Sequence, residues 1–300
     1  QGEESEGVVH AIKFLRDVNN GEKVTVGTRV VVVGGGDAAI DSARVAMRLG
    51  AKEVTVVYRR SHVEIPAIPS EVEDAKEEGV RFMLLTNPTE ILTSKGHITG
   101  VRCVQMRLGE PDHSGRRRPV PIPNSEFTMA VDEMIIAVGQ SADPHGVQNE
   151  LNCTEWATVK ADPVTLATDI PGVFAGGDVF TGPNTVVKAV GHGKAAAESI
   201  DRFIQGIDIM EGRGKDRHRV QSYEVDKSYT PVESRRDMPK QALASRKRAF
   251  SEVELGFNEP TALGEAERCL GCAVCCECEQ CVEACTRDAI DHSMKDEVID

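Results

Sequence analysis

"VVVVGGGDAAIDSARVAMRLGAKEVTVVYRR", residues 30–60, decides the fold of this chain. Together with Arg29 it opens on a short apolar run of β-branched residues, which is typical of a buried parallel strand. The following residues place apolar side chains at helical spacing up to Gly50, and "KEVTVVYRR", residues 52–60, is a second strand of the same kind. A strand, a helix and a strand within about 30 residues form a βαβ unit. The stretch therefore predicts an α/β fold with a parallel sheet.

The turn between the first strand and the helix carries a dinucleotide-binding fingerprint. Gly34, Gly36 and Ala39 give G-x-G-x-x-A, in which the glycines permit a tight turn and close approach of a pyrophosphate, and the small third residue allows close packing. Backbone amides at the helix start hold the anion. The alternative is a structural turn that binds no ligand, which the strand–turn–helix context disfavours. The candidate cofactor-binding residues of this Rossmann-like domain are Gly34, Gly35, Gly36, Asp37, Ala38 and Ala39.

The end of the second strand favours NADP(H) over NAD(H). An acidic residue there would bind the ribose 2′-hydroxyl of NAD, but this sequence has Arg59 and Arg60. Guanidinium groups suit a 2′-phosphate because they donate paired hydrogen bonds to its oxygens. The alternative is that one or both arginines form surface salt bridges.

Other segments extend the pattern. Apolar spacing predicts a helix over residues 8–18, and a capping box of Ser70 and Glu73 predicts another over 70–80. Residues 109–127 are polar and proline-rich and are interpreted as a loop. Further strands are predicted within 81–92, 96–108, 132–140 and 171–178, and a long helix within 183–206.

Composition and charge exclude several classes of partner. The formal net charge of −13 disfavours nucleic acid and anionic lipid. No apolar run approaches the roughly 18 residues that a membrane span needs. Cysteines are sparse before residue 269 and dense after it, which favours a reducing compartment such as the cytoplasm over a secreted disulfide scaffold. Gln1 at the first position leads us to expect a processed product or a fragment.

Seven of the nine cysteines lie between Cys269 and Cys285. The last of them follow C-x2-C-x2-C-x3-C, the bacterial ferredoxin spacing, so we predict at least one 4Fe-4S cluster. Two clusters would need eight thiolates, and Cys276 breaks the rhythm as a spare thiol. Zinc is the alternative, but this many clustered cysteines exceed the four ligands of one zinc ion. The candidate ligands are Cys269, Cys272, Cys275, Cys278, Cys281 and Cys285.

Taken together, these motifs resemble a known family. "VVVVGGGDAAIDSARVAMRLGAKEVTVVYRRSHVEIPA", "DEMIIAVGQ" and "TDIPGVFAGGDVFTGPNTVVKAVGHGKAAAESI" are similar to the glutamate synthase small subunit and related flavin and iron–sulfur pyridine-nucleotide oxidoreductases. "EAERCLGC" and the following cysteines resemble the iron–sulfur segments of multi-cluster relatives. The resemblance implies an NADPH-binding domain inserted into an FAD-binding domain.

The resemblance also implies a second group of cofactor-binding residues. Asp178 in "AGGD", with Gly177 beside it, would hold the FAD ribityl chain, and the helix start at Thr185 and Val186 would face the flavin ring. Gly139 would lie where the chain crosses between the two domains. The family's separate glycine fingerprint for the ADP half of FAD is absent before residue 29. We therefore expect another chain or segment to supply the rest of the FAD site.

These observations predict an NAD(P)H-dependent FAD and iron–sulfur oxidoreductase subunit. It would pass reducing equivalents between NAD(P)H, FAD and 4Fe-4S clusters to a partner protein. The alternatives are a non-catalytic NADPH-binding module and an electron relay with a degenerate nucleotide site. No catalytic acid or base is assigned, because hydride transfer between cofactors requires none. The expected organisation is a connector at 1–25, an NAD(P)H-binding domain at 26–145, part of an FAD domain at 146–205, a linker at 206–265 and a ferredoxin-like segment at 266–300.

Overall fold

The computed structural model describes residues 2–112, 115–140, 142–143, 146, 150–213 and 234–268, with the backbone of 290–291 and 298–299. The described residues fall into two compact units. The first contains those up to residue 213 together with 243–250, and the second contains those of 234–242 and 251–268 with the two short terminal strands.

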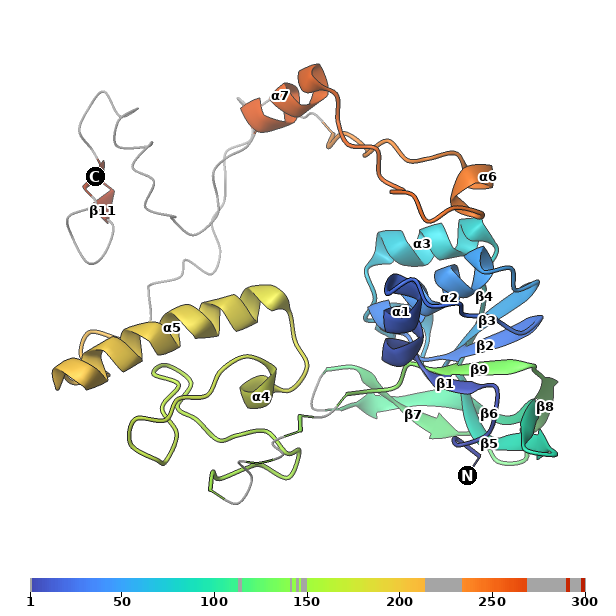
Figure 1. The fold of residues 1–300 in the computed structure, drawn as a ribbon, viewed down its shortest axis with the longest axis horizontal. Coiled ribbons are helices and arrows are strands. Elements are labelled where there is room, and N and C mark those ends of the chain that lie inside the picture. Colours follow the sequence, from blue (N-terminus) through green and yellow to red (C-terminus); the bar gives the residue numbers. More distant parts are fainter. Residues whose placement is uncertain are drawn as a thin grey trace. The chain divides into compact units, whose positions relative to one another are not determined.

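A five-stranded parallel sheet forms the centre of the first unit (Figure 1). Its order is β1–β9–β2–β3–β4, and every neighbouring pair is parallel. Parallel strands bring their carboxyl ends to one edge, so the turns that follow β2, β3 and β9 lie together. The strands are β1 (Val8–His10), β2 (Arg29–Val33), β3 (Glu53–Tyr58), β4 (Arg81–Leu84) and β9 (Glu133–Ile136).

Both faces of the central strand β2 are buried. Val30 and Val32 face a core shared with three helices, whereas Val31 and Val33 face a second core. This explains why the strand is a continuous apolar run, as the sequence predicted. The helices of the first core are α1 (Ala11–Asn19), α2 (Asp37–Arg48) and α3 (Pro69–Glu78).

An antiparallel sheet packs against the other face of the parallel sheet. Its central strand β6 contributes Ile98, Val101 and Cys103 to the second core. Its strands are β5 (Thr86–Ser94), β6 (His97–Pro111), β7 (Arg117–Pro121) and β8 (Phe127–Ala130). The domain therefore has three layers, consisting of helices, a parallel sheet and an antiparallel sheet (Figure 1).

Three local predictions are corrected. The capping box at Ser70 and Glu73 does not form, because Pro69 starts α3 one residue earlier and Ile68 is its N-cap. Residues 109–127 are not all loop, since they contain β7, whose prolines pair with β6 at an edge where a missing N–H is tolerated. The helix predicted over 8–18 begins at Ala11, because residues 8–10 instead pair with β9.

Within residues 150–213 the main element is the helix α5 (Val186–Gln205), which has Thr185 as its N-cap and a left-handed Gly206 as its C-cap. It confirms the long helix that the sequence predicted. A short helix, α4 (Asp178–Thr181), precedes it. The predicted strand over 171–178 is wrong, because this part of the chain contains only an isolated bridge between Ala167 and Phe174.

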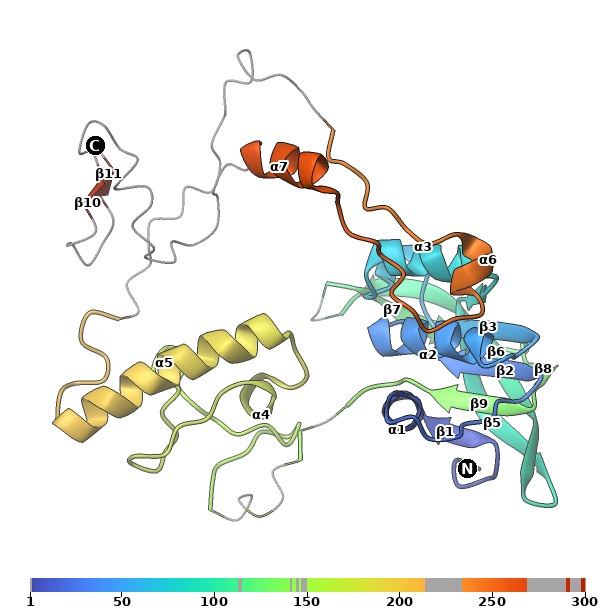
Figure 2. The ribbon, with the colours of Figure 1, turned by 45° about the horizontal axis from the view of Figure 1, so that its top comes forward.

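The range interpreted as a linker, 206–265, contains the helix α6 (Leu243–Arg246) and most of α7 (Glu259–Glu267). Figures 1 and 2 show α6 beside α3, against which it packs. In the second unit, residues 239–241 pair with 253–255, and Asn258 caps α7 by accepting a hydrogen bond from the Thr261 amide at 3.0 Å. The strands β10 (Ile290–Asp291) and β11 (Val298–Ile299) form an antiparallel pair.

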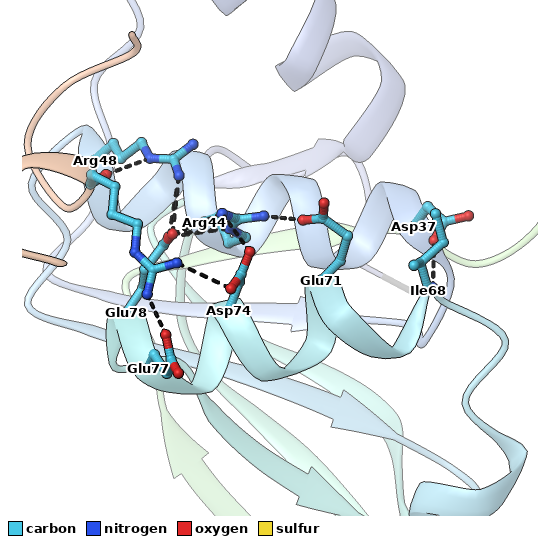
Figure 3. Close-up of polar contacts among 9 residues, drawn as sticks. Asp37, Arg44, Arg48, Ile68, Glu71, Asp74, Glu77 and Glu78 are labelled. Carbon is cyan, nitrogen blue, oxygen red and sulfur yellow. Dashed lines mark hydrogen bonds and ion pairs between the residues drawn. The ribbon is translucent and has the colours of Figure 1, made fainter. Parts of the chain in front are cut away.

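A buried ionic network connects α2, α3 and α6 (Figure 3). Glu78, which is fully buried, accepts hydrogen bonds from Arg44 at 2.8 Å and from Arg48 at 3.1 Å. Arg246 of α6 donates to Asp74 at 3.0 Å, and its carbonyl accepts from Arg48 Nε at 2.8 Å. Paired, hydrogen-bonded charges of this kind tolerate burial that an unpaired charge would not.

Candidate functional site

The glycine turn occupies the carboxyl end of β2. Gly34 has a φ of +143°, and a Cβ atom there would lie 2.5 Å from the Ala137 carbonyl oxygen. Gly34 therefore meets two demands that only glycine satisfies, a left-handed backbone and close approach to the end of β9. Gly35 lies equally close to a neighbour, since its Cβ would lie 2.7 Å from the Tyr58 ring.

Gly36 differs from the two glycines before it. It is the N-cap of α2 with an ordinary extended backbone, φ −87° and ψ 175°, and a Cβ there would meet no atom of the described residues within 4 Å. The space in front of the helix is thus open to a ligand. The amides of Asp37 and Ala38, the first two of α2, make no hydrogen bond within the described residues, and the helix dipole adds partial positive charge. Ala39 is fully buried in the core beneath the turn, so its small side chain permits close helix–strand packing.

Asp37, the first residue of α2, directs its carboxylate toward the start of α3. Its Oδ1 accepts a hydrogen bond from the Ile68 amide at 3.0 Å (Figure 3). A carboxylate beside a pyrophosphate would be unfavourable unless it pointed elsewhere. The bond to Ile68 gives this acidic side chain a partner outside the glycine turn.

A cavity of about 560 Å³ opens at this edge of the sheet. Its volume falls within the range of roughly 300–1,000 Å³ that is usual for small-molecule sites. The sequence-predicted residues Gly34, Gly35, Arg59, Arg60 and Gly139 all line it. The structure therefore brings the first two glycines of the turn, the arginine pair and the end of β9 to one cavity, whereas Gly36, Asp37, Ala38 and Ala39 do not line it.

The two arginines after β3 have different environments. Arg59 is exposed at the cavity, and within the described part of the chain it makes no hydrogen bond or ion pair. Arg60 is buried, and it donates to the Arg117 carbonyl at 2.8 Å and to Asp112 Oδ2 at 2.7 Å. Binding of a 2′-phosphate by this pair stays a prediction, and the geometry makes Arg59 the more accessible of the two.

Sequence reasoning missed part of the cavity wall. Arg116 and residues 86–91 of β5 also line it. The run Arg116–Arg118 was visible as a basic stretch, but its place at the cavity depends on the pairing of β7 with β6. No motif in a single sequence gives that register.

The residues assigned to FAD form a second group. Gly177 has a φ of +69°, and its amide donates to His192 Nδ1 at 3.0 Å. Asp178 Oδ1 accepts from the Asn184 amide at 3.2 Å, and Thr185 caps α5. Val186 is 78% exposed at the same helix start. The loop before α5 thus presents a carboxylate and a helix N-terminus, which are groups that suit a polar cofactor chain and an anion.

The predicted iron–sulfur ligands lie outside the described residues, since the structure describes no side chain after Arg268. Within the ranges that it does describe, no three histidine, cysteine or acidic side chains are grouped so as to hold a metal ion. The iron–sulfur assignment therefore stays a prediction from the sequence. No helix in the described portion is long and apolar enough to cross a membrane.

A family model for pyridine nucleotide-disulphide oxidoreductases matches residues 1–193. The chain belongs to this family. The predicted likeness to the glutamate synthase small subunit is also confirmed, because the chain is 41% identical over 189 residues to the glutamate synthase (NADPH) small chain of Azospirillum brasilense, covering 61% of this chain and 39% of that protein.

Two relatives within the family cover more of the chain. The β subunit of the NADP(+)-dependent formate dehydrogenase of Moorella thermoacetica is 45% identical over 276 residues, which is 89% of this chain and 39% of that protein. The β subunit of the NADPH-Fe(3+) oxidoreductase of Geobacter sulfurreducens is 40% identical over 295 residues, covering 87% and 44%. The chain thus spans less than half the length of these relatives.

Solved structures confirm the fold class. Thioredoxin reductase from Lactococcus lactis is 25% identical with a TM-score of 0.50, covering 64% of this chain and 57% of that one. FprA from Mycobacterium tuberculosis in complex with NADPH has a TM-score of 0.52 at 19% identity, covering 68% and 59%. The second likeness supports the fold alone.

Proposed function

We propose that this chain is part of an electron-transfer oxidoreductase subunit that takes reducing equivalents from NADPH. In this proposal FAD and 4Fe-4S clusters carry them onward to a partner protein. The family membership and the relatives named as subunits of NADP-dependent enzymes support it. The cysteine distribution supports a reducing compartment such as the cytoplasm.

The observation that carries the proposal is the open space in front of α2. Gly36 leaves room for a pyrophosphate, and the first amides of α2 would donate to it. Arg59 lines the cavity beside Gly34 and Gly35 with its guanidinium unpaired within the described residues, and its charge suits a 2′-phosphate. These residues fit NADP(H), and their role is to bind the nucleotide and fix its orientation.

The loop before α5 would hold part of an FAD. Asp178 would accept hydrogen bonds from the ribityl chain, and the amides at Thr185 and Val186 would face negative charge on the ring. When bound, FAD supplies the exchange between two-electron and one-electron transfer that nicotinamide performs poorly. The Cys269–Cys285 segment would hold the clusters.

A further chain or segment would complete the FAD site. Val187 is 80% exposed and Ile204 is 77% exposed on α5, and an apolar face of this kind is usually covered in a complete protein. We propose that its cover is the domain that binds the ADP half of FAD, as the resemblance implies.

An anaerobic absorbance spectrum of the purified chain, with iron and sulfide assays, tests the proposal. A broad visible band that bleaches when NADPH is added, together with flavin peaks, supports the complete relay. Clusters that NADPH does not bleach, in a chain that binds NADPH, support the non-catalytic module instead. A chain that fails to bind NADPH contradicts the proposed function.

A further inference from the structure

The hairpin of β6 and β7 is attached to the end of β3. Buried Arg60 donates to the Arg117 carbonyl at 2.8 Å and to Asp112 at 2.7 Å. Arg117 Nε in turn donates to Glu64 Oε1 at 2.5 Å. Glu64 lies in the segment that follows β3, so Asp112, directly after β6, and Arg117, the first residue of β7, are both bonded to residues next to the end of β3.

This attachment determines where Arg116 lies. Its carbonyl accepts from the Asp112 amide at 2.8 Å, so it is part of the turn between the two points that Arg60 holds. It lines the same cavity as Arg59, although Arg59 follows β3 and Arg116 directly precedes β7. Two guanidinium groups from separate elements therefore border one cavity beside the dinucleotide fingerprint.

We propose that Arg116 is a specificity-determining residue that binds the 2′-phosphate of NADPH together with Arg59. Arg60 is then a positioning residue, because its hydrogen bonds are used to hold the hairpin. This assignment rests on the proposed NADPH function. It makes Arg116, which lies 57 positions beyond Arg59, the second contact to the 2′-phosphate in place of Arg60.

The charges around the cavity support an anion at this place. Glu3 and Glu90 also line it, but Glu90 forms an ion pair with Arg102. Asp112, next to the turn, is paired with Arg60. Glu90 and Asp112 thus have cationic partners of their own, whereas Glu3 makes no ion pair within the described residues. A doubly charged phosphate would meet the positive charges of Arg59 and Arg116 at the cavity wall.

Calorimetric titration of the full chain with adenosine 2′,5′-bisphosphate and with 5′-AMP tests the proposal, because the two probes differ in the 2′-phosphate. We expect R116Q and R59Q each to weaken binding of the bisphosphate about tenfold and to leave 5′-AMP unchanged. R118Q is the matched control, since Arg118 is an exposed arginine two positions along the chain, in β7, that does not line the cavity. It should change neither affinity.

The outcomes separate this proposal from the proposed function. A wild-type chain that binds NADPH, with R116Q unchanged toward the bisphosphate, overturns the role of Arg116 alone. Equal weakening of both probes by R116Q also overturns it. A wild-type chain that binds neither NADPH nor the bisphosphate overturns both proposals.

The positioning role of Arg60 has its own readout. We expect R60Q to lower affinity for the bisphosphate more than for 5′-AMP, because a released hairpin would no longer hold Arg116 at the cavity. A purely structural role would weaken both probes equally, and that result would overturn the assignment of Arg60.

Discussion

Arg246 donates a hydrogen bond to Asp74 at 3.0 Å, although 172 positions separate the two residues in the chain. Both side chains are buried, and Arg246 also pairs with Glu77. The contact attaches α6, which lies in a polar segment, to α3. It therefore makes residues 243–250 part of the first unit.

Replacing Arg246 should release residues 243–250 from α3. R246A would leave Asp74 with Arg44 as its cationic neighbour and should cost about 2 kcal/mol, since hydrogen bonds to charged groups contribute roughly 1.5–3 kcal/mol. Hydrogen exchange of a peptide covering 243–250 should accelerate. R248A is the control, because Arg248 is exposed nearby. Unchanged protection in R246A would contradict the prediction.

Substitutions at Gly34 and Gly36, the two outer glycines of the turn, should affect folding and NADPH binding separately. G34A should destabilise the domain, because its Cβ would lie 2.5 Å from the Ala137 oxygen at a φ of +143°. G36S should fold normally, since serine is a favoured N-cap, yet its side chain would enter the ligand space and compete for the helix amides. Thermal denaturation and NADPH titration check both. Normal NADPH affinity in G36S would place the pyrophosphate elsewhere.

Acid should weaken the attachment of the hairpin through Glu64. Burial raises the pKa of this carboxyl, but hydrogen bonds from Ser61 and Arg117 outweigh it and hold the pKa below the usual 4.5. A lowered pKa means that the carboxylate stabilises the fold above about pH 4.5 and that this contribution is lost as the pH falls through the folded-state pKa. E64Q should therefore be less stable than wild type at pH 7, and the difference should shrink below pH 4.5 in urea denaturation. A difference that is independent of pH would contradict this account.

The thiol of Cys103 should be inert in the folded chain. Burial in the second core raises its pKa to about 11, so at pH 8 it is protonated as well as inaccessible. Iodoacetamide should label Cys153, which is only partly buried, before Cys103. Peptide mass spectrometry reads each site separately, and labelling in urea gives the reference. Equal native labelling rates at the two sites would show that the core opens readily.

The parallel core could be predicted from the sequence because its signals are local. The β-branched run at 30–33 is buried on both faces, and the glycine motif follows it directly in the sequence. The atoms that require glycine at positions 34 and 35 nevertheless belong to the distant residues Ala137 and Tyr58. The start of α3 could not be predicted as easily. Both Pro69 and Ser70 are plausible near a helix start, and the bond from Ile68 to Asp37 joins residues 31 positions apart.

Part of the cavity lining could not be predicted from local sequence patterns, because it depends on the pairing of β6 with β7. Arg60 was predicted as a ligand contact together with Arg59, but its buried bonds to Arg117 and Asp112 depend on where the hairpin lies. The proline-rich composition of residues 109–127 concealed an edge strand. Such features require the register of β6 and β7, which no local pattern contains.

The contrast between Gly34 and Gly36 has a consequence for descendants of this protein. In a lineage that ceased to use a dinucleotide, the Ala137 carbonyl would still select for glycine at position 34, because folding itself demands it. Position 36 would be free to change, since no atom in the described part of the chain comes within 4 Å of a Cβ there. Loss of Gly36 with retention of Gly34 would therefore indicate that a descendant no longer binds a dinucleotide although it keeps the fold.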